Sequence, residues 1–403
     1  MKKPFLTTLL LLLLLGATAQ YRITGRVIAA DGKKPIASAS VFFSNTSKGT
    51  ITNEQGEFAL DNIADGKYDL VVSFIGYETN VQTVQPSKVT APLTIELKVK
   101  VDELKEVVVG GYVKEDWKRW GKFFLDNFIG QSSYAADCTI KNPETIQFRS
   151  YKKHHLIKAF SDETLVIENK ALGYTIHYRL ELFQYDFTTR ILFYQGYPLF
   201  EEMETKRSRK QEHWAAKRET VYYGSELHFM RSLFRNKLAE DGFELRKLIK
   251  QPNLEKQRVK AVYAKSLFKK KAATNGSDLF QDSSAYYNNI LQQPDEKEIV
   301  FPPIAADSIA YAINKTTAGM DFTDYLRITY TKGIEDNDYL SFFRLDRKPM
   351  SPVSVLTLIN KKPVEILANG LYYDAMDLLS TGYWSWSEKI ATMLPFDYWP
   401  AKK

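Results

Sequence analysis

Hydrophobic and polar side chains alternate with a period of two through most of residues 20–99. The alternation is clear in Tyr68–Phe74 and again in Leu93–Leu97, and it is typical of strands with one buried face. Short glycine-containing turns separate the strands, at Asp31-Gly32, Asn53–Gly56, Asp65-Gly66 and Ile75-Gly76-Tyr77. Several short strands joined in this way predict an antiparallel β-sandwich over residues 20–99.

Helical periodicity appears next in the chain. Trp117, Trp120 and Phe124 recur at helical spacing, which predicts an amphipathic helix that packs on a sheet. Residues 206–240 also have a helical pattern, and Gly242 is expected to end that helix.

Further strands are expected in the second half of the chain. Residues Tyr174–Leu182 alternate strictly, and residues 191–200 are predicted to form the neighbouring antiparallel strand. Residues 353–370 have the pattern of a hairpin. A last helix is expected from Trp386 until Pro395 stops it.

The pattern as a whole predicts an α+β chain that is mostly β. A connector strand at residues 100–113 joins the sandwich to a larger mixed domain of antiparallel sheet plus helices at 114–403. Polar, Gln/Asn-rich residues near 250–300 predict a mobile excursion between elements. The clustered acids of Ile334–Tyr339 lack the glycine and terminal glutamate of a calcium loop, so an ordinary loop is expected there.

The N-terminus has the order of a secretory signal peptide. Lys2 and Lys3 precede the leucine run Leu9–Leu15, and a small-residue cleavage motif follows. We expect residues 1–19 to be removed after Ala19, so that the protein is exported. The apolar run is shorter than the roughly 20 residues that span a bilayer, and no transmembrane span is expected in the mature chain.

Composition narrows the classes of partner. The chain is 44% hydrophobic and 13% aromatic, which favours folded domains, and its formal charge is +7. An exported basic protein is expected to meet anionic surface polymers or lipid headgroups rather than nucleic acid. The dense basic run Lys206–Arg218 is interpreted as a solvated helix face. Cys138 is the single cysteine, so no intrachain disulfide is possible.

A more specific pattern lies within the predicted sandwich. Its members are Gly25, Val27, Pro35, Ile36, Ala39, Val41, Gly49, Thr50, Thr52, Gly56, Phe58, Gly66, Tyr68 and Ile75-Gly76-Tyr77. This pattern resembles the carboxypeptidase-regulatory-like domain, which is a transthyretin-like β-sandwich. The resemblance implies an accessory module and not the peptidase itself.

A metallocarboxypeptidase site is not encoded. Such a site needs an H-x-x-E pair and a distant histidine as zinc ligands, and none of the five histidines is followed by glutamate three residues later. We therefore predict no catalytic residues, no metal and no cofactor.

The connector "VDELKEVVVGGY" resembles the segment through which TonB-dependent receptors are gripped by their energy-coupling protein. The residues that carry the resemblance, and that form a candidate partner strand, are Leu104, Glu106, Val107, Val108 and Val109. Such a segment adds a strand either to a partner's sheet edge or within its own protein, and both interpretations stay open. The residues that follow do not resemble the rest of such a receptor.

A candidate aromatic surface lies near the C-terminus. Tyr383, Trp384 and Trp386 are able either to stack on sugar rings or to close the hydrophobic core. The region around them is similar to the tails of uncharacterised cell-envelope proteins that carry the same front domain.

Three functions are consistent with these observations. The first is a non-enzymatic cell-envelope protein, in the periplasm or at the outer-membrane surface of a Gram-negative bacterium, that binds or scaffolds an envelope glycan, a peptide or an outer-membrane receptor. The second is an accessory partner of a TonB-dependent uptake complex. The third is a hydrolase with an unrecognised site in 114–403, which would need His177 or His228 near carboxylates such as Asp321 or Asp324.

Overall fold

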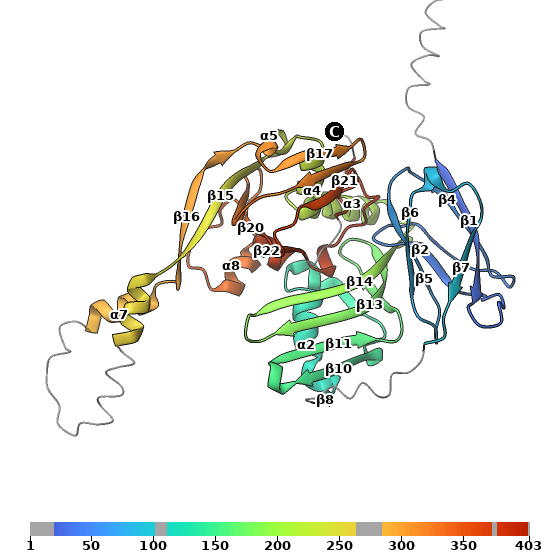
Figure 1. The fold of residues 1–403 in the computed structure, drawn as a ribbon, viewed down its shortest axis with the longest axis horizontal. Helices are drawn as coiled ribbons and strands as arrows, with labels where there is room; N and C mark the ends of the chain where they lie inside the picture. Colours follow the sequence, from blue (N-terminus) through green and yellow to red (C-terminus); the bar gives the residue numbers. More distant parts are fainter. Residues whose placement is uncertain (1–19, 101–110, 263–283, 373–376, 402–403) are drawn as a thin grey trace, which may run out of the picture.

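The computed structural model describes residues 20–100, 111–262, 284–372 and 377–401. Within these residues the chain is mostly β, with antiparallel sheets and helices as predicted (Figure 1). The predicted signal peptide 1–19 and the candidate strand Leu104–Val109 lie outside the described residues. Among the helices that are described, none is both long and apolar enough to cross a membrane.

The N-terminal domain is a sandwich of two sheets. The first sheet contains β4 (Glu57–Ile63), β1 (Tyr21–Ala29) and β7 (Leu93–Leu97), and the second contains β3 (Gly49–Ile51), β2 (Ser40–Phe43), β5 (Tyr68–Ser73) and β6 (Asn80–Val84). The inward residues that the alternation identified, such as Val27, Leu70 and Ile95, are fully buried between them. One pair departs from the predicted antiparallel arrangement, because β1 and β7 run parallel.

Two glycines show why this pattern specifies the sandwich. A Cβ on Gly25 would lie 2.5 Å from the Leu93 carbonyl oxygen and 2.6 Å from the Phe58 ring, so no side chain fits where the strands meet. Gly56 has a φ of +74°, which other residues adopt only at a cost, and it turns the chain into β4.

The central sheet follows the connector. In spatial order its strands are β8 (Val113–Glu115), β10 (Ile146–Tyr151), β11 (Leu156–Ser161), β13 (Tyr174–Asp186), β12 (Leu165–Asn169) and β9 (Cys138–Ile140), with β14 (Ile191–Glu202) paired to β13. The long strand β13 organises this sheet, because β11 and β12 pair with its two halves and β14 pairs along its whole length.

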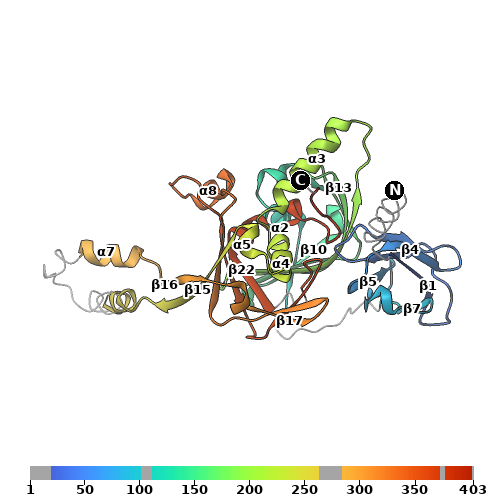
Figure 2. The ribbon, with the colours of Figure 1, turned by 90° about the horizontal axis from the view of Figure 1, so that it is seen from above.

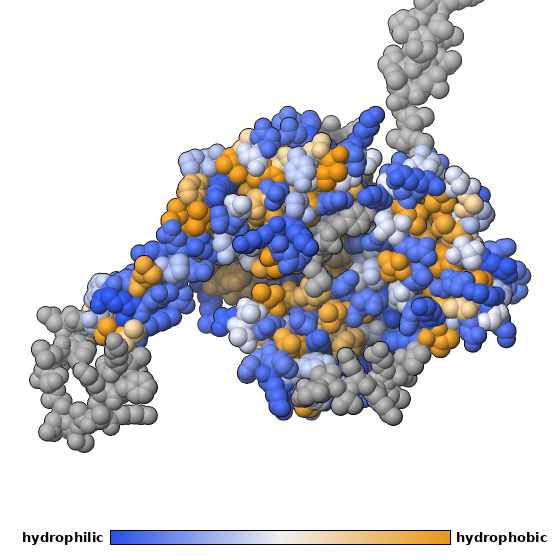
Figure 3. Space-filling model, viewed as in Figure 1, coloured by the Kyte–Doolittle hydropathy of each residue, from blue (hydrophilic) through white to orange (hydrophobic). Residues whose placement is uncertain are grey.

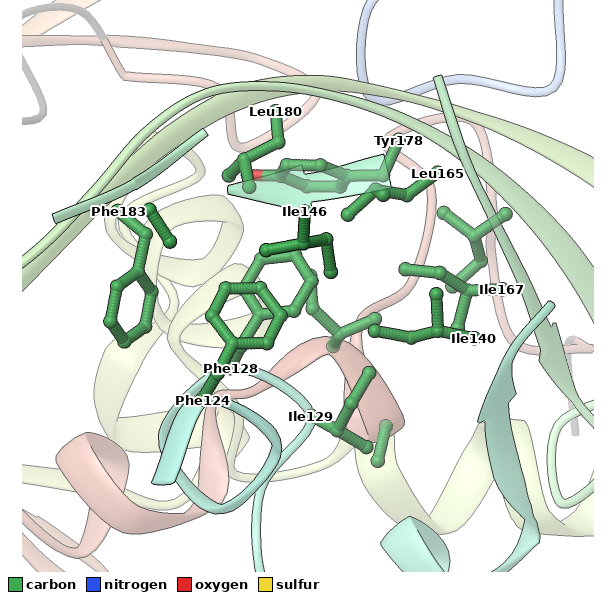
Figure 4. Close-up of a cluster of buried hydrophobic side chains, with 14 of the residues drawn as sticks. Phe124, Phe128, Ile129, Ile140, Ile146, Leu165, Ile167, Tyr178, Leu180 and Phe183 are labelled. Atoms are coloured by element: carbon green, nitrogen blue, oxygen red, sulfur yellow. The ribbon is translucent and has the colours of Figure 1, made fainter. Parts of the chain in front are cut away.

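Helix α2 (Trp117–Phe128) covers one face of the central sheet, as its helical spacing predicted (Figure 1). The Asp116 side chain accepts a hydrogen bond from the Arg119 backbone N–H and so caps the helix. Phe124 and Phe128 are fully buried against the sheet (Figure 4). Burying each phenylalanine side chain contributes about 1.5–3 kcal/mol, so this contact fixes the helix in place.

The C-terminal region contains helices and two more sheets. The helices are α3 (Ser208–Tyr222), α4 (Glu226–Phe234), α5 (Leu238–Asp241), α7 (Ser284–Gln292), α8 (Asn337–Phe343) and α9 (Tyr383–Ser387). The larger sheet has the order β16 (Glu296–Ile304), β15 (Phe243–Pro252), β19 (Tyr325–Tyr330), β20 (Val353–Leu358) and β22 (Leu378–Gly382), and the smaller has β17 (Ala310–Asn314), β18 (Thr317–Met320) and β21 (Val364–Leu367). Short 3₁₀ turns link these and the earlier elements, at Pro86–Lys88, Ser133–Asp137, Pro143–Thr145, Lys152–His154, Ala306–Ser308 and Ile390–Thr392.

The predicted hairpin at 353–370 is wrong. Strand β20 pairs with β19 and β22, whereas β21 pairs with β18 in the other sheet. Alternation shows that a segment is a strand but does not choose its partner, and here each strand has a partner far away in the sequence.

The last predicted helix is also interrupted. Helix α9 ends at Ser387, and Lys389 is extended with φ −128° and ψ 174°. The break lets the chain dock on the central sheet, because Ala391 donates to the Ile129 carbonyl at 3.1 Å and accepts from the Asn169 amide at 2.9 Å.

The acidic cluster that was predicted to be a loop contains regular structure, and so do the described parts of the predicted excursion near 250–300, of which residues 263–283 lie outside the described residues. Strands β15 and β16 form a long arm with α7 near its end, so elements occupy much of residues 250–300 (Figures 1 and 2). Helix α8 begins within the acidic cluster Ile334–Tyr339, because Asp336 caps it by accepting from the Asp338 backbone N–H. Strand pairing stabilises β15 and β16, and capping stabilises the start of α8. Local composition indicates neither interaction.

The C-terminal segment ties the three parts together. Arg231 of α4 is fully buried and donates to the carbonyls of Asn369, Phe396 and Tyr398 at 2.8–2.9 Å. Asp397 accepts from the Ser47 hydroxyl of the sandwich at 2.5 Å. Each part therefore has a defined position relative to the central sheet.

Candidate functional site

The face of the central sheet that points away from α2 carries a row of three cations. Arg149 of β10 is paired directly with Lys114 of β8 on one side and with Lys158 of β11 on the other. Directly paired residues of antiparallel strands project from the same face of a sheet. At about 4.8 Å between strands, the row Lys114–Arg149–Lys158 crosses roughly 10 Å of this face. We call it the basic face.

Without a bound ligand, the like charges of the basic face destabilise the sheet. Like charges directly opposite each other across strands are destabilising. Among the described residues, no carboxylate lies within ion-pair distance of Lys114, Arg149 or Lys158. An anion lying along the row would remove the repulsion and gain three charged partners.

Aromatic rings hold the cations in place. The guanidinium of Arg149 lies 4.8 Å from the centre of the Tyr112 ring and 4.4 Å from that of Phe160. The ammonium of Lys158 lies 5.4 Å from the Tyr151 ring. A guanidinium that packs on aromatic rings in this way still has N–H groups that can donate to a carboxylate or phosphate.

A pocket of about 240 Å³ adjoins Arg149 where the sandwich meets the sheet. Its lining residues are Lys100, Gln147, Arg149, Phe160, Ser161, Asp162, Arg179, Leu180 and Glu181. Lys100 pairs with Asp162, and Arg179 lies 3.4 Å from Glu181. The hydrogen bond from Lys100 lowers the pKa of Asp162, which therefore stays ionised. Arg149 is thus the cation that these two pairs leave unbalanced in the pocket.

Contacts with the sandwich fix this pocket's shape. The Asn45 backbone N–H donates to the Pro198 carbonyl at 2.7 Å, and Thr79 donates to Glu181 at 3.2 Å. Gly49 is packed so closely on Leu199 that a Cβ would lie 2.7 Å from that side chain. The accessory domain therefore packs beside the pocket, and Lys100, the first residue of the connector, lines it.

The aromatic residues predicted near the C-terminus do not form an open surface. Trp384 is 2% exposed and Trp386 is 6% exposed. The Trp384 Nε1–H donates to the Gly224 carbonyl at 2.8 Å, and the Trp386 ring packs against Tyr339 and Tyr383. Of the two interpretations, the structure places these tryptophans in the core, because buried ring faces cannot stack on a sugar.

The structure gives the histidines and acids of the hydrolase hypothesis separate partners. His177 lies on the sheet face 3.1 Å from Glu201. His228 is buried beside Asp241, and burial lowers its pKa to about 4. Asp324 pairs with Lys247 at 3.1 Å, and the Asp321 backbone N–H donates to the Ile309 carbonyl at 2.8 Å. No group of three potential metal ligands occurs in the part of the chain that the structure describes.

A pair of half-buried carboxylates, Glu226 and Glu388, was not identified from the sequence. The Glu226 backbone N–H donates to Glu388 Oε1 at 3.4 Å, and the Glu226 side chain is hydrogen-bonded to Tyr372. Burial, with the nearby charge of Glu226, raises the pKa of Glu388 to about 8. Glu388 therefore keeps its proton at neutral pH. The protonated group avoids placing two negative charges side by side where the C-terminal segment leaves α9.

The sandwich and the central sheet, with the basic face on one side of that sheet, are the arrangement against which the comparisons with known proteins are set. Residues 23–109 match the CarboxypepD_reg-like domain family. The N-terminal domain is therefore a carboxypeptidase-regulatory-like domain, as its pattern predicted. No curated protein matches the chain.

Solved structures offer only distant likenesses. A mutant type II cohesin–X-dockerin complex from Acetivibrio cellulolyticus is 22% identical, covers 20% of this chain and 58% of its own, and has a TM-score of 0.16. The matched region thus spans little more than half of that protein. A protein of unknown function from Bacteroides fragilis, provisionally described as membrane-associated, is 11% identical, with 91% and 96% coverage and a TM-score of 0.17.

Proposed function

We propose that this protein is a non-enzymatic exported protein of the cell envelope that binds an acidic glycan on its basic face. The observation that carries the proposal is the row Lys114–Arg149–Lys158, three cations in cross-strand register with no carboxylate partner among the described residues. A polymer with a carboxylate on each sugar supplies several anions in a row. A line of carboxylates of this kind is complementary in charge to the three cations of the row.

The shape of the site favours an extended ligand. The cations lie across an open sheet face, with Tyr112, Tyr151 and Phe160 beside them. A small enclosed anion would contact one cation, whereas an extended chain reaches all three. The sandwich acts as a scaffold, since Lys100 and Thr79 hold the neighbouring wall.

Isothermal titration calorimetry with polygalacturonate oligomers tests the proposal, with neutral dextran as the matched probe. We expect the wild-type protein to bind polygalacturonate and not dextran, with an affinity that falls as ionic strength rises. Arg149→Gln should weaken binding about tenfold or more, because a charge-assisted hydrogen bond is lost.

Lys315→Gln is the control substitution. Lys315 is exposed on the turn between β17 and β18, away from the basic face, and its loss removes the same net charge. Equal weakening by Arg149→Gln and Lys315→Gln would contradict the proposal, because only net charge would then matter. Binding of dextran as strong as that of polygalacturonate would also contradict it.

The uptake-complex alternative concerns a different segment and has its own test. Cross-linking in cells, with and without residues Leu104–Tyr112, would show a change in the captured partners if that segment adds a strand to a coupling protein. Unchanged partners would remove this alternative and leave the glycan proposal intact.

A further inference from the structure

Residues Glu335–Met350 form a loop that is closed at its base. The Glu335 backbone N–H donates to the Met350 carbonyl at 2.8 Å, and the Met350 N–H donates to the Glu335 carboxylate at 3.0 Å. Arg347 donates to both oxygens of that carboxylate, at 2.5 and 2.9 Å. Glu335 is 6% exposed, so the brace is shielded from water. We call this closed segment the α8 loop.

One side of the α8 loop is anchored to the protein. Leu340 is buried, and the Tyr339 ring packs on Tyr383 and Trp386. The helix ends at Arg344, whose φ is 53°, and this left-handed residue turns the chain back toward the base. The loop is therefore held in one orientation.

The other side exposes large apolar residues. They are Phe342 (48% exposed), Phe343 (46%), Leu345 (37%) and Met350 (55%), and Ile334 (74%) lies just before the loop. Figure 2 shows α8 projecting from the body of the molecule. Figure 3 shows hydrophobic residues scattered among hydrophilic ones on the visible face, and some of them lie in the hollow between the upper and lower parts of the molecule. Clustered exposed apolar side chains mark an interaction surface.

Basic side chains border the apolar tip. Among the described residues, Arg344 and Lys348 have no ion-pair partner, and Asp346 is the one acid between them. Asp336 and Asp338 lie at the opposite end of α8. The tip therefore has a small positive charge, which is complementary to an anionic surface. Long basic side chains can keep their charge at such a surface while the apolar side chains beside them leave water.

We propose that the α8 loop inserts Phe342, Phe343 and Leu345 into the interface of an anionic lipid surface, with Arg344 and Lys348 at the headgroups. A stable protein interface uses about 20–30 residues on each side, which is more than this projecting loop offers. A small apolar tip bordered by cations is instead the arrangement that interfacial membrane binding requires. The inference concerns a different surface from the basic face and does not depend on glycan binding.

Co-sedimentation with vesicles tests the proposal. One set contains phosphatidylglycerol mixed with phosphatidylethanolamine, and the other contains phosphatidylcholine alone. We expect binding to the anionic set, reduced about tenfold or more by Phe342→Ser with Phe343→Ser. Arg344→Gln with Lys348→Gln should reduce binding to the anionic vesicles.

Ile51→Ser is the matched control, because Ile51 is 68% exposed on β3 of the sandwich. It should leave vesicle binding unchanged. Thermal melts of all variants show whether each is folded, and unchanged polygalacturonate binding by the loop variants separates this test from that of the basic face.

Three results would overturn the proposal. The first is wild-type vesicle binding by the folded Phe342→Ser, Phe343→Ser variant. The second is no binding of the wild-type protein to anionic vesicles. The third is self-association in analytical ultracentrifugation that these two substitutions abolish, since the loop would then dock on a second copy.

Discussion

The two faces of the central sheet are made from the same strands and differ in nearly every property. Toward α2 the strands present an apolar layer that includes Ile146, Tyr178 and Phe183, and Phe124 of α2 packs in the same core (Figure 4). On the opposite face the alternate residues are Lys114, Arg149 and Lys158. The apolar face accounts for the fold. The charged face weakens the sheet, and this cost is the reason that the proposed function is assigned to it.

The largest expected effect on the free energy of unfolding comes from truncating a buried side chain at the apolar face. Phe124→Ala should lower the free energy of unfolding by about 3–5 kcal/mol, because it leaves a cavity in a closely packed layer. Phe160→Ala on the basic face is the comparison, and it should cost much less because Phe160 is only half-buried. Urea unfolding of both variants measures the difference, and equal losses would mean that the two faces are not distinct.

A second pair of substitutions compares Arg231, whose guanidinium is hydrogen-bonded to three carbonyls, with Arg149, which has no carboxylate partner among the described residues. Arg231→Met should cost about 3 kcal/mol, because it leaves three half-buried carbonyls without their donor. Arg149→Met should change stability little. The same urea experiment checks both, and a larger loss for Arg149 would show that its role is structural.

The stability of the protein should also depend on pH, through the buried residue His228. Burial lowers the pKa of His228 to about 4, below its usual value of 6.5. Between these values the unfolded chain binds a proton that the folded protein does not, so stability falls as the pH drops from 6.5 to 4. His228→Gln should remove about 3 kcal/mol of this fall. Unfolding curves at several pH values test it, and an identical pH dependence in the variant would contradict the assignment.

The smallest stability effect is expected on the basic face itself. Lys158→Gln removes one of the repelling charges, and it should leave stability unchanged or raise it by up to about 0.5 kcal/mol. Thermal denaturation without ligand measures this. A clear loss of stability would mean that Lys158 serves the fold, contrary to the proposed role.

Local pattern was enough to predict one part of this molecule. In the sandwich, inward residues such as Val27 and Leu70 and the turn glycine Gly56 each define their own strand or turn. The helix at Trp117–Phe128 and the long strand β13 were predictable for the same reason.

Pairing between distant segments was not predictable. Alternation places Arg149 on a polar face, but only the register of β8, β10 and β11 brings it beside Lys114 and Lys158. The hairpin predicted at 353–370 failed for this reason too, since each of its strands joins a different sheet. A basic residue on an amphipathic helix, as Arg231 is, gives no sign in the sequence that carbonyls from the C-terminal segment enclose it.

One calorimetric comparison tests the central claim most directly. Polygalacturonate and its methyl ester, which has lost the carboxylate charge, are each titrated into the wild-type protein and into Arg149→Gln. If Arg149 receives a ligand carboxylate, the substitution weakens binding of the acid about tenfold and leaves the much weaker binding of the ester unchanged. Equal weakening for both ligands, or none for the acid, would contradict the assignment of the basic face.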